Sequence, residues 1–239
     1  MLMENKSIGK SIRPIFIPNR NDIGVIEREI SFDWHMGMSR EVRKRSINSL
    51  HNEARKQGFS HILEASSKSE QDIGIQLSAF FLKNIKGYPV ENLFQSSKVF
   101  EKGGPFRDLL TVTPREAKKD ERLRKSGNLI KFTFNKKNYP LEPESLFYDW
   151  LYLNVLFSDR NLDLREKFFE SKFEAFSDIE FNPKKSFSCQ ARTLALCVSL
   201  YENESVKDFI EDPIGFSQQF SLYNKEFIFH RNEQANFNF

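Results

Sequence analysis

The sequence predicts an α+β fold in which helices predominate. Three observations support this prediction. Apolar residues recur at helical spacing in several stretches that also carry end signals, either a capping residue before the first turn or a glycine or proline after the last. The strand-like stretches between them are short and scattered along the chain. A length of 239 residues with 39% hydrophobic residues suits one large domain, or one domain with an elaboration.

The N-terminal part predicts two strands and a helix after a polar arm. Residues 13–18 form an apolar run between two prolines, which favours an edge strand. Residues 24–34 alternate imperfectly between apolar and polar and predict a second strand. Ser39 is a good N-cap and Gly58 a good stop for a helix between them.

This predicted helix is basic. Six cations against two carboxylates give it a net charge of +4: Arg40, Arg43, Lys44, Arg45, Arg55 and Lys56 against Glu41 and Glu53. Such a stripe of charge could follow a nucleic-acid phosphate backbone. An ordinary solvated helix face has the same composition, so both interpretations stay open.

The next elements are short. Residues 61–65 predict a strand and residues 66–69 a polar loop. Residues 77–82 form an apolar segment that leads to the most informative stretch of the chain.

That stretch, residues 88–100, predicts a helix with two distinct faces. Pro89 suits the first turn, and the glycine pair at 103–104 suits a left-handed cap at the far end. One face is expected to be buried, at positions i, i+3, i+4 and i+7: Val90, Leu93, Phe94 and Ser97. Another stripe carries a carboxylate, an amide and amines on successive turns: Glu91, Gln95, Lys98 and Lys102. The structural alternative is a first-turn glutamate that stabilises its own helix beside solvated neighbours.

A basic region follows. Thr113 and Glu116 have the spacing of a capping box and predict a helix start. Six cations against three carboxylates give residues 115–125 a net charge of +3. Residues 129–134 alternate like a strand, and residues 138–140 carry a turn signal.

The C-terminal half predicts more helices. Residues 142–157 are apolar nearly all round, so this helix should be central, and Trp150 is most simply a core residue of it. Residues 161–176 predict a helix with phenylalanines on its inner side, and a short helix is expected at about 205–211.

A further helix should start near Ser186 or Ser188, either of which could cap it, and run through Val198. Its free N–H groups, with Lys184 and Lys185 beside them, would make an anion site suited to a pyrophosphate. A plainly capped helix would have the same sequence.

Several classes of protein are disfavoured. Cys189 and Cys197 would lie about 12 Å apart along one helix, too far to form a disulfide. The N-terminus has no apolar leader, and no apolar run approaches membrane-spanning length, so we expect a soluble cytoplasmic protein. There is no Walker motif, dinucleotide fingerprint, zinc spacing or Ser-His-Asp pattern, so we expect no cofactor and no metal.

Four groups of residues resemble the NADAR family, and in particular the branch found beside DarT-type DNA ADP-ribosyltransferase toxins. They occur in the expected order, and as a set they are specific: Pro89 to Lys98; Leu63 to Ser69 with Leu77 to Phe80; Phe147 to Trp150; and Phe176 to Ser186 with Cys189 to Arg192. The chain departs from the family at one position, where Asn92 replaces the common histidine after the glutamate.

The resemblance implies a helical core with short strands. It covers roughly residues 60–212, so we interpret residues 60–239 as a NADAR-like domain with a C-terminal arm at 213–239. Residues 1–59 would then be an N-terminal strand–strand–helix elaboration packed on the same core.

The resemblance also implies a site. Glu91, Lys98 and Asp178 are the candidate catalytic residues. The candidate substrate-binding residues are Lys68, Ser78, Gln95, Trp150, Asn182, Lys185 and Arg192. Lys68 could equally be an exposed loop lysine, and Trp150 could stack on a base or simply fill the core.

The implied activity is removal of ADP-ribose from guanine in DNA by an antitoxin enzyme that reverses modification by a DarT-type toxin. Its partners would be ADP-ribosylated DNA, ADP-ribose and the cognate toxin, with no membrane. One alternative is a non-catalytic antitoxin that binds ADP-ribose or the toxin. Another is an N-glycosidase that acts on phosphorylated intermediates of riboflavin synthesis.

Overall fold

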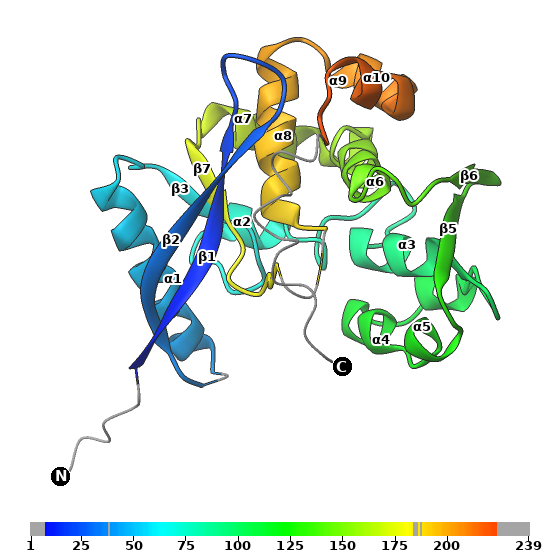
Figure 1. Cartoon of the computed structure of the whole chain (residues 1–239), viewed down its shortest axis with the longest axis horizontal. Helices are drawn as coiled ribbons and strands as arrows, with labels where there is room; N and C mark the ends of the chain where they lie inside the picture. Colours follow the sequence, from blue (N-terminus) through cyan, green and yellow to red (C-terminus); the bar gives the residue numbers. More distant parts are fainter. Residues whose placement is uncertain (1–7, 38, 184–185, 187, 224–239) are drawn as a thin grey trace.

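The computed structural model describes residues 8–37, 39–183, 186 and 188–223. It has the α+β fold that the sequence predicts. A four-stranded sheet with the strand order β2-β1-β7-β3 lies on one side of the molecule (Figure 1). Its strands are β1 (Ile8–Pro18), β2 (Val25–His35), β3 (Ile62–Glu64) and β7 (Ala175–Ser177).

The register of this sheet corrects one prediction. β1 is not an edge strand, because it pairs antiparallel with β2 along its whole length and with β7 at Phe16 opposite Phe176. The strand pairing between β1 and β7 is limited to that one pair of residues. The prolines of β1 therefore remove few hydrogen bonds between these two strands. β7 and β3 pair in parallel.

Helices cover both faces of the sheet. α1 (Arg40–Lys56) packs on β2, with Oγ of Ser39 accepting the N–H of Val42 as the predicted N-cap. α8 (Gln190–Glu202) packs on β1 and β7. Successive residues of β1 belong to the two cores: Ile15 to the core under α1 and Phe16 to the larger core under α8.

A second, three-stranded antiparallel sheet lies apart from the first (Figure 1). It contains β4 (Lys98–Phe100), β5 (Leu129–Phe134) and β6 (Lys137–Tyr139). The predicted turn at residues 138–140 is wrong, because the chain turns at Asn135 and Lys136, which both adopt positive φ angles, 46° and 65°.

The helix predicted from Pro89 onward is shorter than expected. α3 runs over Val90–Ser97, and Lys98 already has extended backbone angles as the start of β4. The hydroxyl of Ser97 donates to the carbonyl of Leu93 over 2.7 Å, and Lys98 pairs with Phe132 of β5. Pairing with β5, which is distant in sequence, therefore overrides the helical periodicity of the next residues.

α6 (Leu146–Leu156) is the central helix, as predicted, and all but one of its residues are buried. The remaining helices are shorter: α2 (Asp72–Gln76), η1 (Arg107–Leu110), α4 (Pro114–Lys119), α5 (Arg122–Lys125), η2 (Asp159–Asn161), α7 (Leu162–Glu170), α9 (Val206–Glu211) and α10 (Pro213–Gln219). α4 begins with the predicted capping box of Thr113 and Glu116.

Two predictions for the C-terminal half are wrong. The helix expected over 161–176 ends at Glu170, since Lys172 takes a positive φ of 50° and Phe176 joins the sheet. The N-cap of α8 is Cys189, without a side-chain capping bond, and neither Ser186 nor Ser188 caps the helix.

The N-terminal strands share their sheet with β3 and β7, so the predicted elaboration is continuous with the rest of the fold. A domain division between residues 59 and 60 stays a prediction. Within the described part of the chain, no helix combines the length and apolar character needed to cross a membrane.

Candidate functional site

Glu91 lies in the first turn of α3 and is only 5% exposed. Its Oε1 accepts a hydrogen bond of 2.8 Å from Nε2 of Gln95, one turn further along the helix. Its backbone N–H donates to the carbonyl of Ala79 over 2.9 Å. These contacts fix the carboxylate and leave its second oxygen, Oε2, to face other groups.

Lys98 reaches the same region from β4 rather than from a second turn of the helix. Its Nζ lies 4.6 Å from the ring centroid of Phe94, and the side chain is half-buried. Burial lowers the pKa of Lys98 to about 8, although the charge of Glu91 works in the opposite direction and that of Lys118 in the same direction. The site therefore contains an amine that gives up its proton more readily than an ordinary lysine.

Lys118 of α4 is a site residue that the sequence did not identify. Its Nζ lies 3.6 Å from Oε2 of Glu91 and 5.5 Å from the ring of Phe80. The side chain is 59% exposed, so it lies where the site opens to solvent. The only signal in the sequence was the basic composition of residues 115–125.

A chain of hydrogen bonds joins Glu91 to Asp178. The carbonyl of Ala79 accepts the N–H of Glu91, and the N–H of Ala79 donates over 2.6 Å to Oε1 of Gln190. Nε2 of Gln190 then donates to Oδ2 of Asp178 over 3.0 Å. Gln190 belongs to one of the runs that resemble the family, but nothing else in the sequence marks this glutamine as a site residue.

The charges of both carboxylates, Glu91 and Asp178, act on Tyr148 of α6. Its ring meets that of Phe94 edge-on, with centroids 5.0 Å apart. Burial, and then the negative charges of Glu91 and Asp178 among others, raise the pKa of Tyr148 well above its usual range. Its hydroxyl therefore stays protonated. Hydrogen bonds and charge thus link four predicted residues, Glu91, Gln95, Lys98 and Asp178, to Tyr148 and Lys118, which were not predicted.

A buried network holds Asp178 in place. Oε2 of Glu64 accepts the hydroxyl of Ser177 over 2.5 Å, and its Oε1 accepts the N–H of Ile179 over 2.9 Å. Nε2 of His51 lies 2.8 Å from the same Ser177 hydroxyl. Burial and the neighbouring charge of Glu64 raise the pKa of Asp178. Glu64 therefore clamps both residues that flank Asp178 and favours its protonated form.

Other predicted binding residues lie in nearby loops. Lys68 is half-buried in the loop after β3, and its ammonium makes no ion pair with any described residue. Ser78 is buried and donates its hydroxyl to the carbonyl of Ile75. Asn182 is half-buried in the segment after Asp178. Lys185 lies outside the described residues, and the roles of all four stay predictions.

Trp150 lies in the core rather than in the site. It follows Tyr148 by two residues, about 200° around α6, so its ring points away from Glu91. Its Nε1 donates to the carbonyl of Ile210 over 3.0 Å, and its ring packs 4.6 Å from that of Tyr139. Trp150 is therefore a core residue of this structure, and its stacking on a base stays a prediction.

Arg192 is also occupied elsewhere. Its Nη1 lies 2.8 Å from Oδ2 of the buried Asp149, and its guanidinium lies 5.1 Å from the ring of Tyr223. Burial raises the pKa of Asp149, and the charge of Arg192 opposes that shift. In this structure the arginine compensates a buried carboxylate, and its predicted role in substrate binding stays a prediction.

Some of the cations of α1 form ion pairs within the protein. Arg43 pairs with Glu180, its Nε 3.2 Å from Oε1, and its guanidinium lies 4.8 Å from the ring of Trp34. Lys44 pairs with Glu70 over 3.5 Å. Arg43 and Lys44 are therefore paired with carboxylates of two loops, after β7 and after β3.

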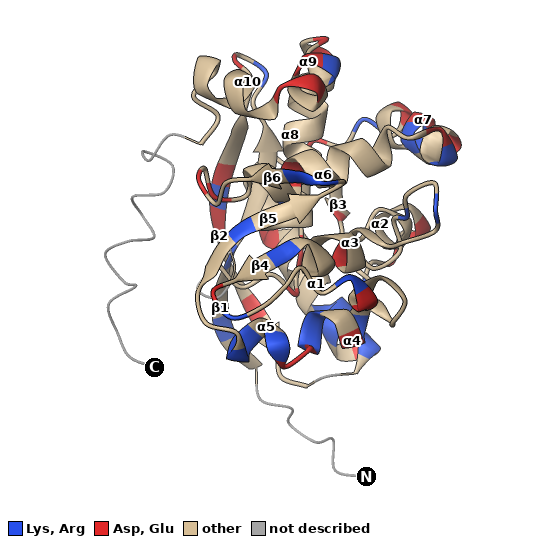
Figure 2. Ribbon diagram, turned by 90° about the vertical axis from the view of Figure 1, so that its right-hand side faces the viewer, with Lys and Arg blue, Asp and Glu red and all other residues tan. Residues whose placement is uncertain are grey.

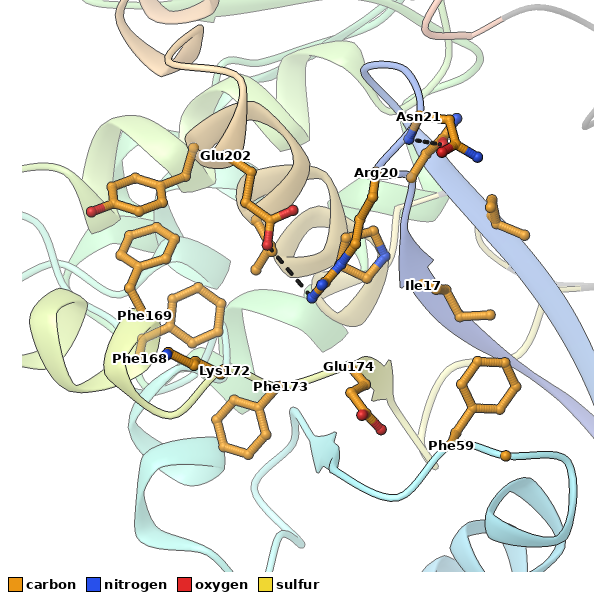
Figure 3. Close-up of a pocket in the computed structure, with 16 residues that line it drawn as sticks. Ile17, Arg20, Asn21, Phe59, Phe168, Phe169, Lys172, Phe173, Glu174 and Glu202 are labelled. Carbon is orange, nitrogen blue, oxygen red and sulfur yellow. Dashed lines mark hydrogen bonds and ion pairs between the residues drawn. The ribbon is translucent and has the colours of Figure 1, made fainter.

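A cavity of about 800 Å³ lies elsewhere (Figure 3). Ile17, Phe59 and Phe173 contribute to its apolar wall, and Arg20 pairs with Glu202 inside it. Its other carboxylate, Glu174, accepts hydrogen bonds from Ser60 and the N–H of His61. Arg20, Glu202 and Glu174 are therefore paired or hold loops, and we place the chemistry at Glu91 instead.

Comparison with known proteins agrees with the resemblance seen in the sequence. Residues 11–227 match the family model described as DarT1-associated NADAR antitoxin. No curated protein matches the chain. The matched range includes the N-terminal strands and α1 as well as Glu91, Lys98 and Asp178. The chain therefore belongs to the DarT1-associated NADAR antitoxin family.

Proposed function

We propose that this protein is an antitoxin enzyme that hydrolyses the N-glycosidic bond between ADP-ribose and guanine in DNA, and so reverses modification by a DarT-type toxin. Membership of the antitoxin family supports the biological role. The observation that carries the chemistry is the buried carboxylate of Glu91, which pairs with Lys118, interacts electrostatically with Lys98 and is linked by hydrogen bonds to a second carboxylate, Asp178. The two carboxylates have different surroundings, because Glu91 pairs with a lysine and Asp178 lies beside Glu64.

Glu91 is suited to stabilise positive charge. Cleavage of an N-glycosidic bond passes through an oxocarbenium-like state, and a fixed carboxylate lowers the energy of that state. Gln95 fixes the carboxylate through Oε1, so little reorganisation is needed during the reaction. Lys118, at the opening of the site, is suited to hold the anionic pyrophosphate of the substrate.

Asp178 is suited to donate a proton. The guanine amine must leave neutral, and its nitrogen takes the electron pair of the broken bond and one proton. The raised pKa of Asp178 keeps a protonated fraction available near neutral pH. Tyr148, which also keeps its proton, can hydrogen-bond the substrate between the two carboxylates.

Lys98 has two possible roles. As an ammonium it would anchor the substrate near Glu91. As a neutral amine it would attack the anomeric carbon while the bond to guanine breaks, and ring opening would give a Schiff base. Water would then add to that carbon, release ADP-ribose and restore the amine.

The test is release of free ADP-ribose from guanine-modified DNA by purified protein, followed by chromatography and mass spectrometry under multiple-turnover conditions. We expect unmodified guanine and ADP-ribose in equal amounts. A protein that binds ADP-ribose but releases none would instead be a reader, and the enzyme proposal would be wrong. Activity only on phosphorylated riboflavin intermediates would assign the site to that other substrate.

A further inference from the structure

The segment from Thr113 to Ser126, which contains α4 and α5, carries exposed positive charge beside the site. Figure 2 shows lysines and arginines gathered on these two helices, on the face that also carries β4. Arg115, Lys119 and Arg124 are all exposed, and among the described residues none of them forms an ion pair. Six cations against three carboxylates give residues 115–125 a net charge of +3.

The carboxylates of this segment serve its own structure. Glu116 closes the capping box by accepting the N–H of Thr113 over 2.8 Å and its hydroxyl over 2.7 Å. Asp120 and Asp108 both bind the guanidinium of Arg122. The same local pairing joins Glu121 to Lys125. The three unpaired cations are therefore the ones left for a partner.

The segment is anchored directly to the site. Next to Glu91, the side-chain amide of Asn92 donates to the carbonyls of Leu109 and Val112, 2.8 Å from each, and so holds the chain that leads into α4. Lys118, beside Lys119 on α4, reaches Glu91. A polymer bound along the outer side of α4 and α5 would thus pass the opening of the site.

We propose that the α4–α5 segment binds the phosphate backbone of the DNA strand that carries the modified guanine, with Arg115, Lys119 and Arg124 as phosphate contacts. This inference rests on the proposed function, because it explains how a polymer is held while one base reaches Glu91. Unpaired, exposed cations on one face suit a polyanion better than a folded protein partner, which would require acidic and apolar complementarity.

The test compares two charge-matched variants. One carries Arg115→Glu, Lys119→Glu and Arg124→Glu. The control carries Arg160→Glu, Lys167→Glu and Lys207→Glu, at exposed cations of η2, α7 and α9. The helices α7 and α9 lie away from α4 and α5 (Figure 2). Binding to an unmodified, fluorescent single strand of about 20 nucleotides is measured by anisotropy across a range of salt concentrations. Thermal unfolding checks that both variants are folded.

We expect the α4–α5 variant to bind more weakly and to lower the slope of log affinity against log salt by about 2, from three lost contacts on a single strand. The control should keep the wild-type slope. Turnover on a modified 20-mer should show a raised KM in the α4–α5 variant only.

Each outcome discriminates. Equal weakening in the control would show a net-charge effect and overturn the inference. An unchanged slope in the α4–α5 variant would also overturn it and leave the segment to another partner, such as the toxin. If wild-type protein binds DNA through this segment but releases no ADP-ribose, the surface is supported while the proposed hydrolysis fails.

Discussion

Nζ of Lys118 lies 3.6 Å from Oε2 of Glu91, so an exposed lysine of α4 pairs with a buried carboxylate of α3. With Lys98 nearby, the charges of two lysines act on Glu91. ADP-ribose brings a pyrophosphate with two negative charges. The arrangement therefore suits an anionic ligand whose phosphates face the open side and whose ribose lies deeper, near Glu91.

We predict that Glu91→Gln abolishes hydrolysis and leaves the fold intact. Removing the carboxylate charge should lower kcat by roughly 10²-fold or more, because a fixed charge opposite the developing cation is lost. Single-turnover rates on guanine-modified DNA would measure this effect.

Gln95→Glu is a useful companion, because it replaces the amide that donates to Glu91 with a second negative charge and should also slow the reaction. Unfolding temperatures of both variants should stay near the wild-type value. A folded Glu91→Gln protein with an unchanged rate would remove Glu91 from the mechanism.

Local signals predicted much of this fold correctly. Caps, alternation and apolar periodicity located α1, β5, α6 and the start of α4, because each depends on residues close in sequence. The sequence does not predict the end of α3, because Lys98 is fixed by pairing with Phe132, which is distant in sequence. It predicts helix at Phe176 of β7, because the strand partners of this residue, Leu63 and Phe16, are also distant in sequence.

The site was predictable in part for the same reason. Glu91 and Gln95 lie on one helix, so spacing alone places them together. Lys118 and Gln190 reach Glu91 and Asp178 from other elements, and no local pattern distinguishes them from surface residues. On α6, the charges of Glu91 and Asp178 act on Tyr148, and the helix is too uniformly apolar for its periodicity to single out this residue.

We predict that His51→Gln makes the protein more resistant to mild acid. Burial lowers the pKa of His51 to about 4 in the folded state, against about 6.5 when unfolded. The unfolded chain therefore binds an extra proton as the pH falls from 6.5 towards 4, and the stability contributed by neutral His51 is lost over that window. The effect at pH 4 should be on the order of 3 kcal/mol.

Urea unfolding of both proteins at pH 7 and pH 4 would test this. Glutamine can keep the contact with Ser177 without titrating. The raised pKa values of Glu64 and Asp178 act in the opposite direction, but in both proteins, so the comparison isolates His51. The same loss of stability in wild type and variant would show that His51 does not control acid sensitivity.

We predict that α1 contributes to DNA binding less strongly than α4 and α5. Reversing Lys44 and Arg45 to glutamate should lower the salt slope of binding by about 1, because Lys44 is already paired with Glu70 and only Arg45 is free to contact a phosphate. Anisotropy titrations with the same single strand would measure it. An unchanged slope would mean that α1 presents only a solvated face.

The last prediction concerns Lys98, which we expect to lie within reach of the ribose nearest guanine and to be the best candidate for a covalent intermediate. Burial next to Phe94 lowers its pKa to about 8, so its neutral, nucleophilic fraction increases as the pH rises towards 8. Glu91 opposes this shift, and a lysine kept fully protonated would act as an anchor instead.

Borohydride added during turnover would reduce a Schiff base to a stable adduct, and peptide mass analysis would locate it. We expect the adduct on Lys98, in a yield that rises between pH 7 and pH 8, and none in Lys98→Arg, which keeps the charge but cannot form the adduct. An adduct on Lys68 would move the nucleophile to the loop after β3. Intact hydrolysis with no adduct on any lysine would leave direct attack by water, assisted by Glu91 and Asp178, and exclude covalent catalysis by Lys98.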